Sequence, residues 1–135
     1  MWADPSSPSA VKGSLNGLLS ESFRETHPDV LSRIAEWRIS EDAGRETFEA
    51  HRAAVEGFDL SDRLYELTTP TLVVHGTEDA VCPKPAAEGL AEGLPRGEFH
   101  SIAGARHLVG VEKSAAVNDA LVGWLAEHAA DPFSE

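Results

Sequence analysis

The stretch PTLVVHGTEDAVCP, from Pro70 to Pro83, joins an apolar run to an acidic turn. Its four apolar or β-branched residues, TLVV, lead into a histidine and a glycine, and a short continuous run of this kind is typical of a strand covered on both faces. Glu78 and Asp79 follow directly. An acid in such a turn is most often a turn former, so the question is whether Asp79 also has a chemical role at the strand end.

The chain after Pro83 alternates between helical and extended patterns. Residues 84–94 (KPAAEGLAEGL) predict a helix, 97–104 (GEFHSIAG) a second strand, and 113–128 (KSAAVNDALVGWLAEH) a helix with an apolar stripe. Strand, helix, strand and helix joined by short loops imply parallel strands with right-handed crossovers. The predicted fold class is therefore α/β.

The chain before Pro70 is predicted to be largely helical. Residues 1–14 are rich in Ser, Pro and Asp and predict a flexible N-terminal segment. Thr26 and Pro28 indicate a helix start, Ser40 is a candidate cap for another helix, and residues 60–67 predict a further short helix. We expect four parts: the segment 1–14, a helical region 15–57, an α/β region 58–130 and a tail 131–135.

Length and composition indicate one globular domain. The chain has 135 residues, 41% of them hydrophobic, and contains no apolar segment of about 18 residues that could span a membrane. Its start shows no secretory signal pattern. A single cysteine, Cys82, excludes an intrachain disulfide and fits a reducing compartment. We expect a cytoplasmic protein.

The charge balance is strongly acidic. The sequence has 23 Asp and Glu against 11 Lys and Arg, for a net charge of −12. Nucleic acids and anionic membranes need a basic face, so neither is an expected partner. Only three basic residues are lysines. An acidic, lysine-poor surface fits either a salt-adapted (halophilic) protein, in which salt screens self-repulsion, or a merely acidic mesophilic one.

Two chemically useful side chains follow the two predicted strands. Asp79 lies after the first strand, and His107 lies in the loop AGARHLVGVE after the second. Because the carboxyl ends of parallel strands meet at one edge of a sheet, we expect both side chains at that edge. A carboxylate can fix the tautomer of an imidazole, which leaves the other ring nitrogen to take a proton from a nucleophile.

Residues 64–125 resemble the C-terminal part of the α/β-hydrolase superfamily. In that family the triad Asp follows a strand that ends in glycine, and the triad His lies in a Gly-x-x-His turn after the next strand. The last helix follows a Glu and ends in a Trp-Leu or Phe-Leu pair. The matching positions are Asp79, Gly104, His107, Glu112 and Trp124-Leu125. The resemblance implies that Asp79 and His107 are catalytic.

The helical region is similar to the lid of a lactonase-like branch. Residues 17–37 (GLLSESFRETHPDVLSRIAEW) and the approach to the first strand resemble 3-oxoadipate enol-lactonases and related carboxylesterases. The resemblance implies that residues 15–57 form a lid over an apolar pocket, with Trp37 and Phe48 facing it. It also implies a small ester or lactone as substrate and no cofactor.

The sequence contains no nucleophile that fits this family. A serine hydrolase of this fold carries Gly-x-Ser-x-Gly on a strand-to-helix turn, whereas Ser14 in GSLNG directly follows its glycine. Family members carry that motif in an N-terminal half of comparable size, so we expect this chain to be the lid plus the last two core strands. Three hypotheses remain: the C-terminal part of an ester or lactone hydrolase, a non-catalytic subunit that complements a serine-bearing partner, or a degenerate fragment that either pairs with a second copy or has no function.

Other candidate ligands give weaker signals. His27, His51, His100 and His128 show no paired metal-ligand spacing, so no metal site is predicted. His75 lies inside the first strand, where a hydrogen-bonded histidine of the core, or one behind the site, is expected. Cys82 lacks the glycine-flanked turn of thiol hydrolases and is expected to be inert.

Overall fold

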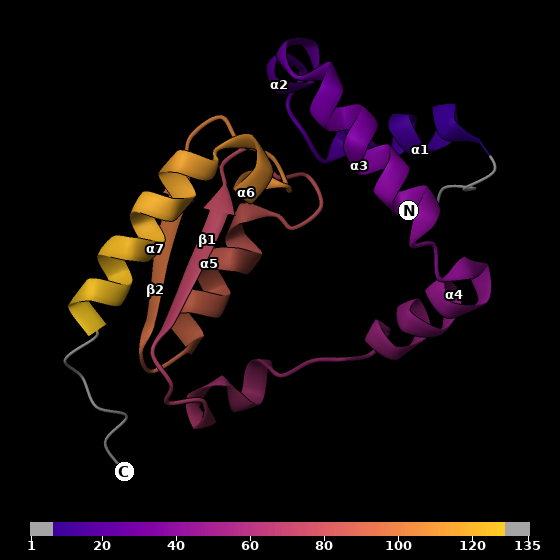
Figure 1. The fold of residues 1–135 in the computed structure, drawn as a ribbon. Coiled ribbons are helices and arrows are strands. Elements are labelled where there is room, and N and C mark those ends of the chain that lie inside the picture. Colours follow the sequence, from indigo (N-terminus) through magenta and orange to yellow (C-terminus); the bar gives the residue numbers. More distant parts are fainter. Residues whose placement is uncertain (1–6, 129–135) are drawn as a thin grey trace. The chain divides into compact units, whose positions relative to one another are not determined.

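The computed structural model describes residues 7–128, and Figure 1 shows their ribbon. The elements in chain order are α1 (Pro8–Ser14), η1 (Leu15–Gly17, 3-10), α2 (Glu21–Thr26), α3 (Pro28–Ser40), α4 (Gly44–Val55), η2 (Ser61–Glu66, 3-10), β1 (Thr71–Gly76), α5 (Lys84–Gly93), β2 (Gly97–Ile102), α6 (Val109–Glu112) and α7 (Ser114–His128). The chain forms two compact units, Met1–Asp59 and Leu60–Glu135. Within residues 7–128, no helix is both long and apolar enough to cross a membrane.

The first unit begins with a helix, whereas its sequence predicts a flexible segment there. The hydroxyl of Ser7 accepts a hydrogen bond from the Ala10 N–H at 3.4 Å, and a proline follows in the first turn, so α1 has a regular helix start. Val11 is buried, and α1 packs on α3. The prediction of a flexible segment up to residue 14 is therefore wrong for residues 8–14, which form a capped helix with a buried valine. Residues 1–6 and the predicted tail 131–135 lie outside the described residues.

The helix boundaries in this unit are set by hydrogen bonds that the sequence pattern did not reveal. Pro28 opens α3 as predicted, but Thr26 closes α2, where its hydroxyl donates to the Ser22 carbonyl at 2.8 Å. Ser40 is the last residue of α3 and donates to the Trp37 carbonyl at 3.1 Å. Ser40 therefore does not cap the next helix, which begins at Gly44.

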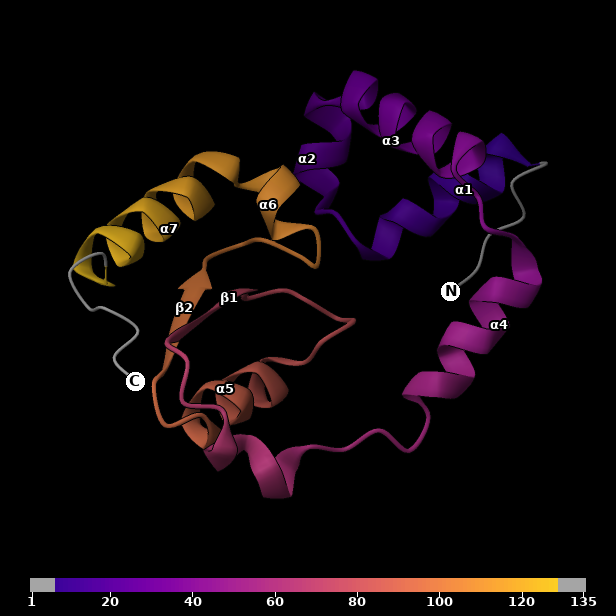
Figure 2. The same cartoon turned by 60° about the horizontal axis from the view of Figure 1, so that its bottom comes forward.

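The second unit is built on a two-stranded parallel sheet. The register pairs Thr71 with Gly97 and continues to Gly76 with Ile102, and α5 forms the crossover. Helix α5 packs on one face of the sheet and α7 lies on the other, as Figure 2 shows. The predicted α/β class with parallel strands is confirmed.

Small side chains let α5 lie close to the sheet. The buried apolar residues of this unit are Ala87, Ala91, Leu94, Ile102 and Ala105. A side chain at Gly97 would meet the carbonyl oxygen of Ala91 at 2.2 Å, so only glycine fits where β2 begins. This close packing fixes the position of β2, whose carboxyl end carries the loop with His107.

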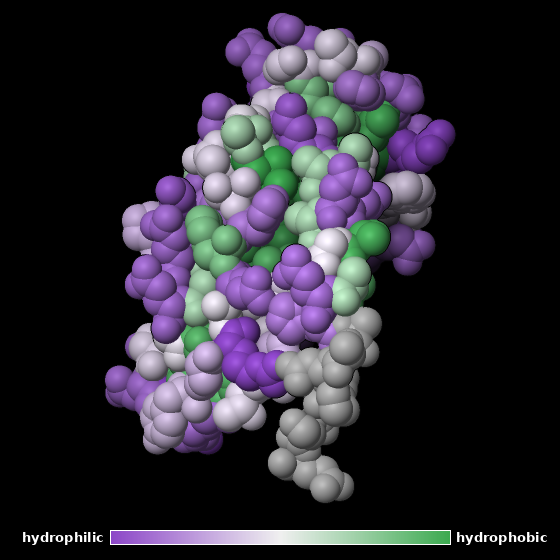
Figure 3. All heavy atoms as spheres, turned by 90° about the vertical axis from the view of Figure 1, so that its left-hand side faces the viewer, coloured by the Kyte–Doolittle hydropathy of each residue, from purple (hydrophilic) through white to green (hydrophobic). Residues whose placement is uncertain are grey.

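Helix α7 leaves part of its predicted apolar stripe exposed. Leu125 is 58% exposed and Leu121 is 39% exposed, while Val122 on another side is 66% exposed. Figure 3 views the side of the molecule on which α7 lies and shows apolar side chains emerging among polar ones. An apolar stripe along a helix therefore does not by itself show which of its residues are buried.

Candidate active site

The carboxyl ends of β1 and β2 bring two loops together at one sheet edge. The loop after β1 carries Asp79 and the loop after β2 carries His107, which lies 28 residues further on. The two strands end level with each other, because Gly76 pairs with Ile102. Parallel pairing therefore delivers an acid and an imidazole to the same place, as the alternation of elements predicted.

Hydrogen bonds connect the two loops directly. The Thr77 N–H donates to the Ile102 carbonyl at 3.0 Å, and the Glu78 N–H donates to the Ala105 carbonyl at 2.9 Å. In the opposite direction, the Gly104 N–H donates to the Thr77 hydroxyl at 2.9 Å. These three contacts hold the loop of the imidazole against the loop of the acid.

The close approach of the loops depends on a glycine. A Cβ atom added at Gly76 would lie 2.4 Å from the Ala105 carbonyl oxygen and 2.5 Å from that of Arg106. Gly104 has a φ of +69°, a left-handed conformation that suits glycine. The glycine that ends β1 thus serves the site by leaving room for the His107 loop.

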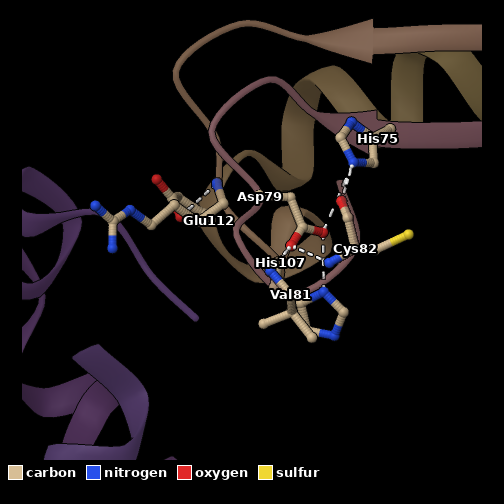
Figure 4. A network of polar contacts seen from close by, with 7 residues as sticks. His75, Asp79, Val81, Cys82, His107 and Glu112 are labelled. Carbon is tan, nitrogen blue, oxygen red and sulfur yellow. Dashed lines mark hydrogen bonds and ion pairs between the residues drawn. The ribbon is translucent and has the colours of Figure 1, made fainter. Parts of the chain in front are cut away.

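Asp79 uses its two carboxylate oxygens for different tasks, as Figure 4 shows. Oδ1 accepts hydrogen bonds from the backbone N–H groups of Val81 at 2.8 Å and Cys82 at 2.9 Å. Oδ2 lies 2.9 Å from Nδ1 of His107. Asp79 is therefore both a turn former and a partner of the imidazole, so the two interpretations of this residue hold together.

The environment of Asp79 favours its ionised form. Its side chain is only 6% exposed, and burial by itself would raise the pKa of the carboxyl. Hydrogen bonds from the Cys82 N–H, His107 and the Val81 N–H outweigh burial and lower the pKa of Asp79 below its ordinary value. A buried carboxylate that stays charged is a suitable partner for an imidazole that gains a proton.

The imidazole of His107 has one ring nitrogen fixed and the other open to a reactant. A carboxylate only accepts, so Nδ1 carries the hydrogen and donates it to Asp79. Nε2 then presents a lone pair, and no hydrogen bond to it is found among residues 7–128. The side chain is 38% exposed. This arrangement can accept a proton from a neighbouring hydroxyl, water or thiol.

Two buried polar residues form hydrogen bonds with the loops, and the sequence pattern predicted no specific contact for either. His75, 5% exposed, lies 2.7 Å through Nε2 from the Cys82 carbonyl oxygen. Glu112, 9% exposed, accepts the Arg106 N–H through Oε2 at 3.4 Å. The sequence features that could have indicated these contacts are a histidine just before the glycine that ends β1 and a glutamate five residues after His107.

The remaining predicted site residues lie apart from this pair in the sequence. Trp37 on α3 is 60% exposed and Phe48 on α4 is half-buried. Both belong to the first unit, and their role as pocket residues stays a prediction. Cys82 has a free, half-buried thiol whose sulfur points away from Asp79 in Figure 4. Among residues 7–128, no group of three or more His, Cys, Asp or Glu side chains could hold a metal ion.

The family can be assigned by comparison with known proteins. The family model for serine aminopeptidase S33, an α/β-hydrolase family, matches residues 34–114, which is more than half of the chain. The chain belongs to the α/β-hydrolase family. The match runs from α3 through both strands to the start of α7, so it includes Asp79 and His107.

Individual relatives agree with this assignment. RutD of Variovorax paradoxus, named for carbamate hydrolysis, is 32% identical over 83 residues, which cover 62% of this chain and 31% of that protein. A thermophilic esterase from Thermogutta terrifontis aligns with a TM-score of 0.74 and 30% identity, over 87% of this chain and 43% of that one. The enol-lactonase from Burkholderia xenovorans aligns with a TM-score of 0.77, over 87% of this chain and 44% of that one; at 20% identity, this likeness concerns the fold alone.

The chain corresponds to only part of the length of its relatives. It spans between 31% and 40% of the length of the first three curated relatives it matches. The likeness to the lactonase extends the α/β-hydrolase fold beyond the region of the family match, over 87% of the chain. The fold predicted from the sequence is thereby confirmed.

Proposed function

We propose that this chain supplies the acid and the base of a Ser-His-Asp triad in a hydrolase of a small ester or lactone. The observation that carries the proposal is the 2.9 Å contact between Asp79 Oδ2 and His107 Nδ1, at the edge of the sheet where two loops are joined. His107 would take the proton of a serine as base and then protonate the leaving group as acid. Asp79 would hold the tautomer and stabilise the imidazolium that forms.

The serine in this proposal comes from polypeptide that the present sequence does not contain. No Gly-x-Ser-x-Gly motif occurs among its 135 residues. No hydroxyl or thiol of residues 7–128 is hydrogen-bonded to Nε2 of His107. The nucleophile and the donors that stabilise an oxyanion would belong to the remainder of a longer chain or to a separate partner chain.

Similarity to known hydrolases supports the substrate class in this proposal. The esterase from Thermogutta terrifontis and the resemblance of residues 15–57 to a lactonase lid favour esters and lactones. The name of RutD adds carbamates as a class to test. In this proposal Trp37 and Phe48 would line the apolar part of the pocket, and no cofactor or metal takes part.

A second candidate is a non-catalytic fragment or complementing subunit, favoured by the partial coverage of every relative named above. In that case the Asp79–His107 pair would keep the geometry of the family, but this chain would not catalyse a reaction. The two candidates differ in whether activity that depends on His107 appears once a serine-bearing segment is supplied.

The test uses p-nitrophenyl butyrate, a lactone and a p-nitrophenyl carbamate as substrates. They are offered to the purified chain and to a fusion in which the preceding segment of the Thermogutta terrifontis esterase is joined to it. The proposal expects turnover by the fusion that is lost in His107→Ala and strongly reduced in Asp79→Asn. Glu78→Gln, which changes an exposed neighbouring acid, is the matched control and should retain activity.

Three outcomes decide between the candidates. Turnover by the chain alone that vanishes with His107→Ala would place the nucleophile in this sequence or in a second copy. A folded fusion that hydrolyses substrate equally well without His107 would refute the proposed base. A folded fusion with no turnover on any of the three substrates would favour the non-catalytic candidate.

A further inference from the structure

The ring of His75 is buried behind the acid of the proposed pair. It lies in β1 next to Gly76, is 5% exposed and packs against Phe99 with ring centroids 6.1 Å apart. Its Nε2 lies 2.7 Å from the carbonyl oxygen of Cys82, and Figure 4 shows this bond on the side of the Asp79 loop toward the strands. Because a carbonyl only accepts, Nε2 carries the hydrogen.

This contact holds Cys82 from a second side; Cys82 lies in the loop after β1 that carries Asp79, called the acid loop below. The N–H of Cys82 donates to Oδ1 of Asp79 at 2.9 Å, and its C=O accepts from His75 at 2.7 Å. The neighbouring N–H of Val81 donates to the same Oδ1 at 2.8 Å. Holding the Cys82 carbonyl therefore fixes the peptide groups whose N–H groups orient the carboxylate.

We propose that His75 is a positioning residue, which holds the Cys82 carbonyl so that the acid loop presents Asp79 to His107. The proposal rests on the proposed function, because it assigns His75 a task in the same acid and base pair. His75 touches no reacting atom; it acts through the backbone of the loop.

The unpaired state of the other ring nitrogen supports a specific need for a hydrogen-bond donor at position 75. Nδ1 of His75 is buried and has no hydrogen-bond partner within the described part of the chain. An unpaired buried polar atom costs stability, so a residue that served packing alone would be better as an apolar side chain. Nε2 also lies 3.9 Å from Oδ2 of Asp79, which places the ring directly behind the acid.

The experiment follows the loop by NMR in the intact chain. His75→Phe keeps an aromatic ring and removes the donor, whereas His75→Gln places an amide N–H near the position of Nε2. His100→Phe, at an exposed site on the adjacent strand, is the matched control for adding phenylalanine. The readouts are hydrogen exchange of the Val81 and Cys82 amides, normalised to Phe99 in β2, and the titration of the Asp79 carboxyl carbon.

The proposal expects a specific response. In His75→Phe, the two amides should exchange roughly fivefold faster, as the loss of one ordinary hydrogen bond implies. The pKa of Asp79 should rise, because the hydrogen bonds from Cys82 and Val81 that lower it weaken. His75→Gln should restore both readouts and His100→Phe should change neither.

Two results would overturn the proposal. One is unchanged exchange of the Val81 and Cys82 amides in a folded His75→Phe chain, or exchange that His100→Phe accelerates as much as His75→Phe does. The other needs no variant: ¹⁵N spectra of the parent chain that place the hydrogen of His75 on Nδ1. If His75→Phe does not fold, this tautomer measurement decides the question. These readouts need no turnover, so a failed ester assay beside an intact His75 effect would reject the catalytic role alone.

Discussion

Replacing Gly76 by alanine tests whether the approach of the two loops sets the site. The added Cβ would lie 2.4 Å from the Ala105 oxygen and 2.5 Å from the Arg106 oxygen, and real Cβ atoms essentially never come closer than 3.0 Å to such atoms. The His107 loop must therefore retreat from the end of β1. The hydrogen bond from the Glu78 N–H to Ala105, now 2.9 Å, lies directly at this contact.

The expected cost comes from two terms. Forcing a methyl group into a close-packed contact costs about 1–3 kcal/mol. Losing the Glu78–Ala105 hydrogen bond adds about 1 kcal/mol. Gly76→Ala should then lower the free energy of unfolding by about 2–4 kcal/mol. It should also weaken the contact between His107 and Asp79.

The matched control is the same substitution at Gly89 in α5, where an added Cβ meets nothing within 4 Å. Alanine there should stabilise the chain by about 0.5–1 kcal/mol, because it is the better helix former. Urea unfolding of both variants, followed by tryptophan fluorescence and circular dichroism, measures the two effects. The reasoning is refuted if Gly76→Ala unfolds at the same urea concentration as the parent chain, or if both variants shift in the same direction.

Four further outcomes are expected. The pKa of Asp79 is lowered in the folded state, so the ionised carboxylate stabilises the fold fully above its ordinary pKa of 3.8. This stabilisation is lost as the pH falls through 3.8 toward the folded pKa. Urea midpoints between pH 3 and 7 should therefore fall as the pH is lowered, and Asp79→Asn should remove this dependence. Asp79→Asn should also turn an amide N–H toward Nδ1 of His107 and move the ring hydrogen to Nε2, and ¹⁵N spectra that still place it on Nδ1 would contradict this. Trp124→Phe removes the 2.8 Å bond from Nε1 to the half-exposed carboxylate of Glu98 and should cost less than about 1.5 kcal/mol in urea unfolding; a loss twice as large would be inconsistent with so exposed a pair. Sodium chloride near 1 M should raise the urea midpoint by screening the net charge of −12, whereas a fall would count against self-repulsion as a significant term.

The sequence was informative where the signal was local and repeated. The apolar run before Gly76 predicted β1, and the alternation of strand and helix predicted that β2 would pair with it in parallel. From that topology alone, Asp79 and His107 were expected at one sheet edge, and the structure brings them to 2.9 Å. The order of strands, helices and loops along the chain determines that both side chains follow the carboxyl end of a strand. This placement can therefore be predicted without coordinates.

What the sequence did not predict depends on where backbone groups lie in space. The bond from His75 to the Cys82 carbonyl and the close contact at Gly76 involve carbonyl positions that side-chain patterns do not encode. Ser40 illustrates a second limit. Its type suits a helix start, but its hydroxyl donates to the Trp37 carbonyl within α3, since several local hydrogen bonds compete for a serine.

The joined loops also govern how the acid and the base come together during folding. Asp79 and His107 are separated by 28 residues, and closing a segment of that length costs roughly 3 kcal/mol in chain entropy, apart from a constant. The parallel pairing of β1 with β2 already meets this cost, so the contact between the two side chains adds no further closure penalty. The pair should therefore form in the same step in which β2 docks on β1. Any local opening that detaches β2 would separate the acid from the base at once.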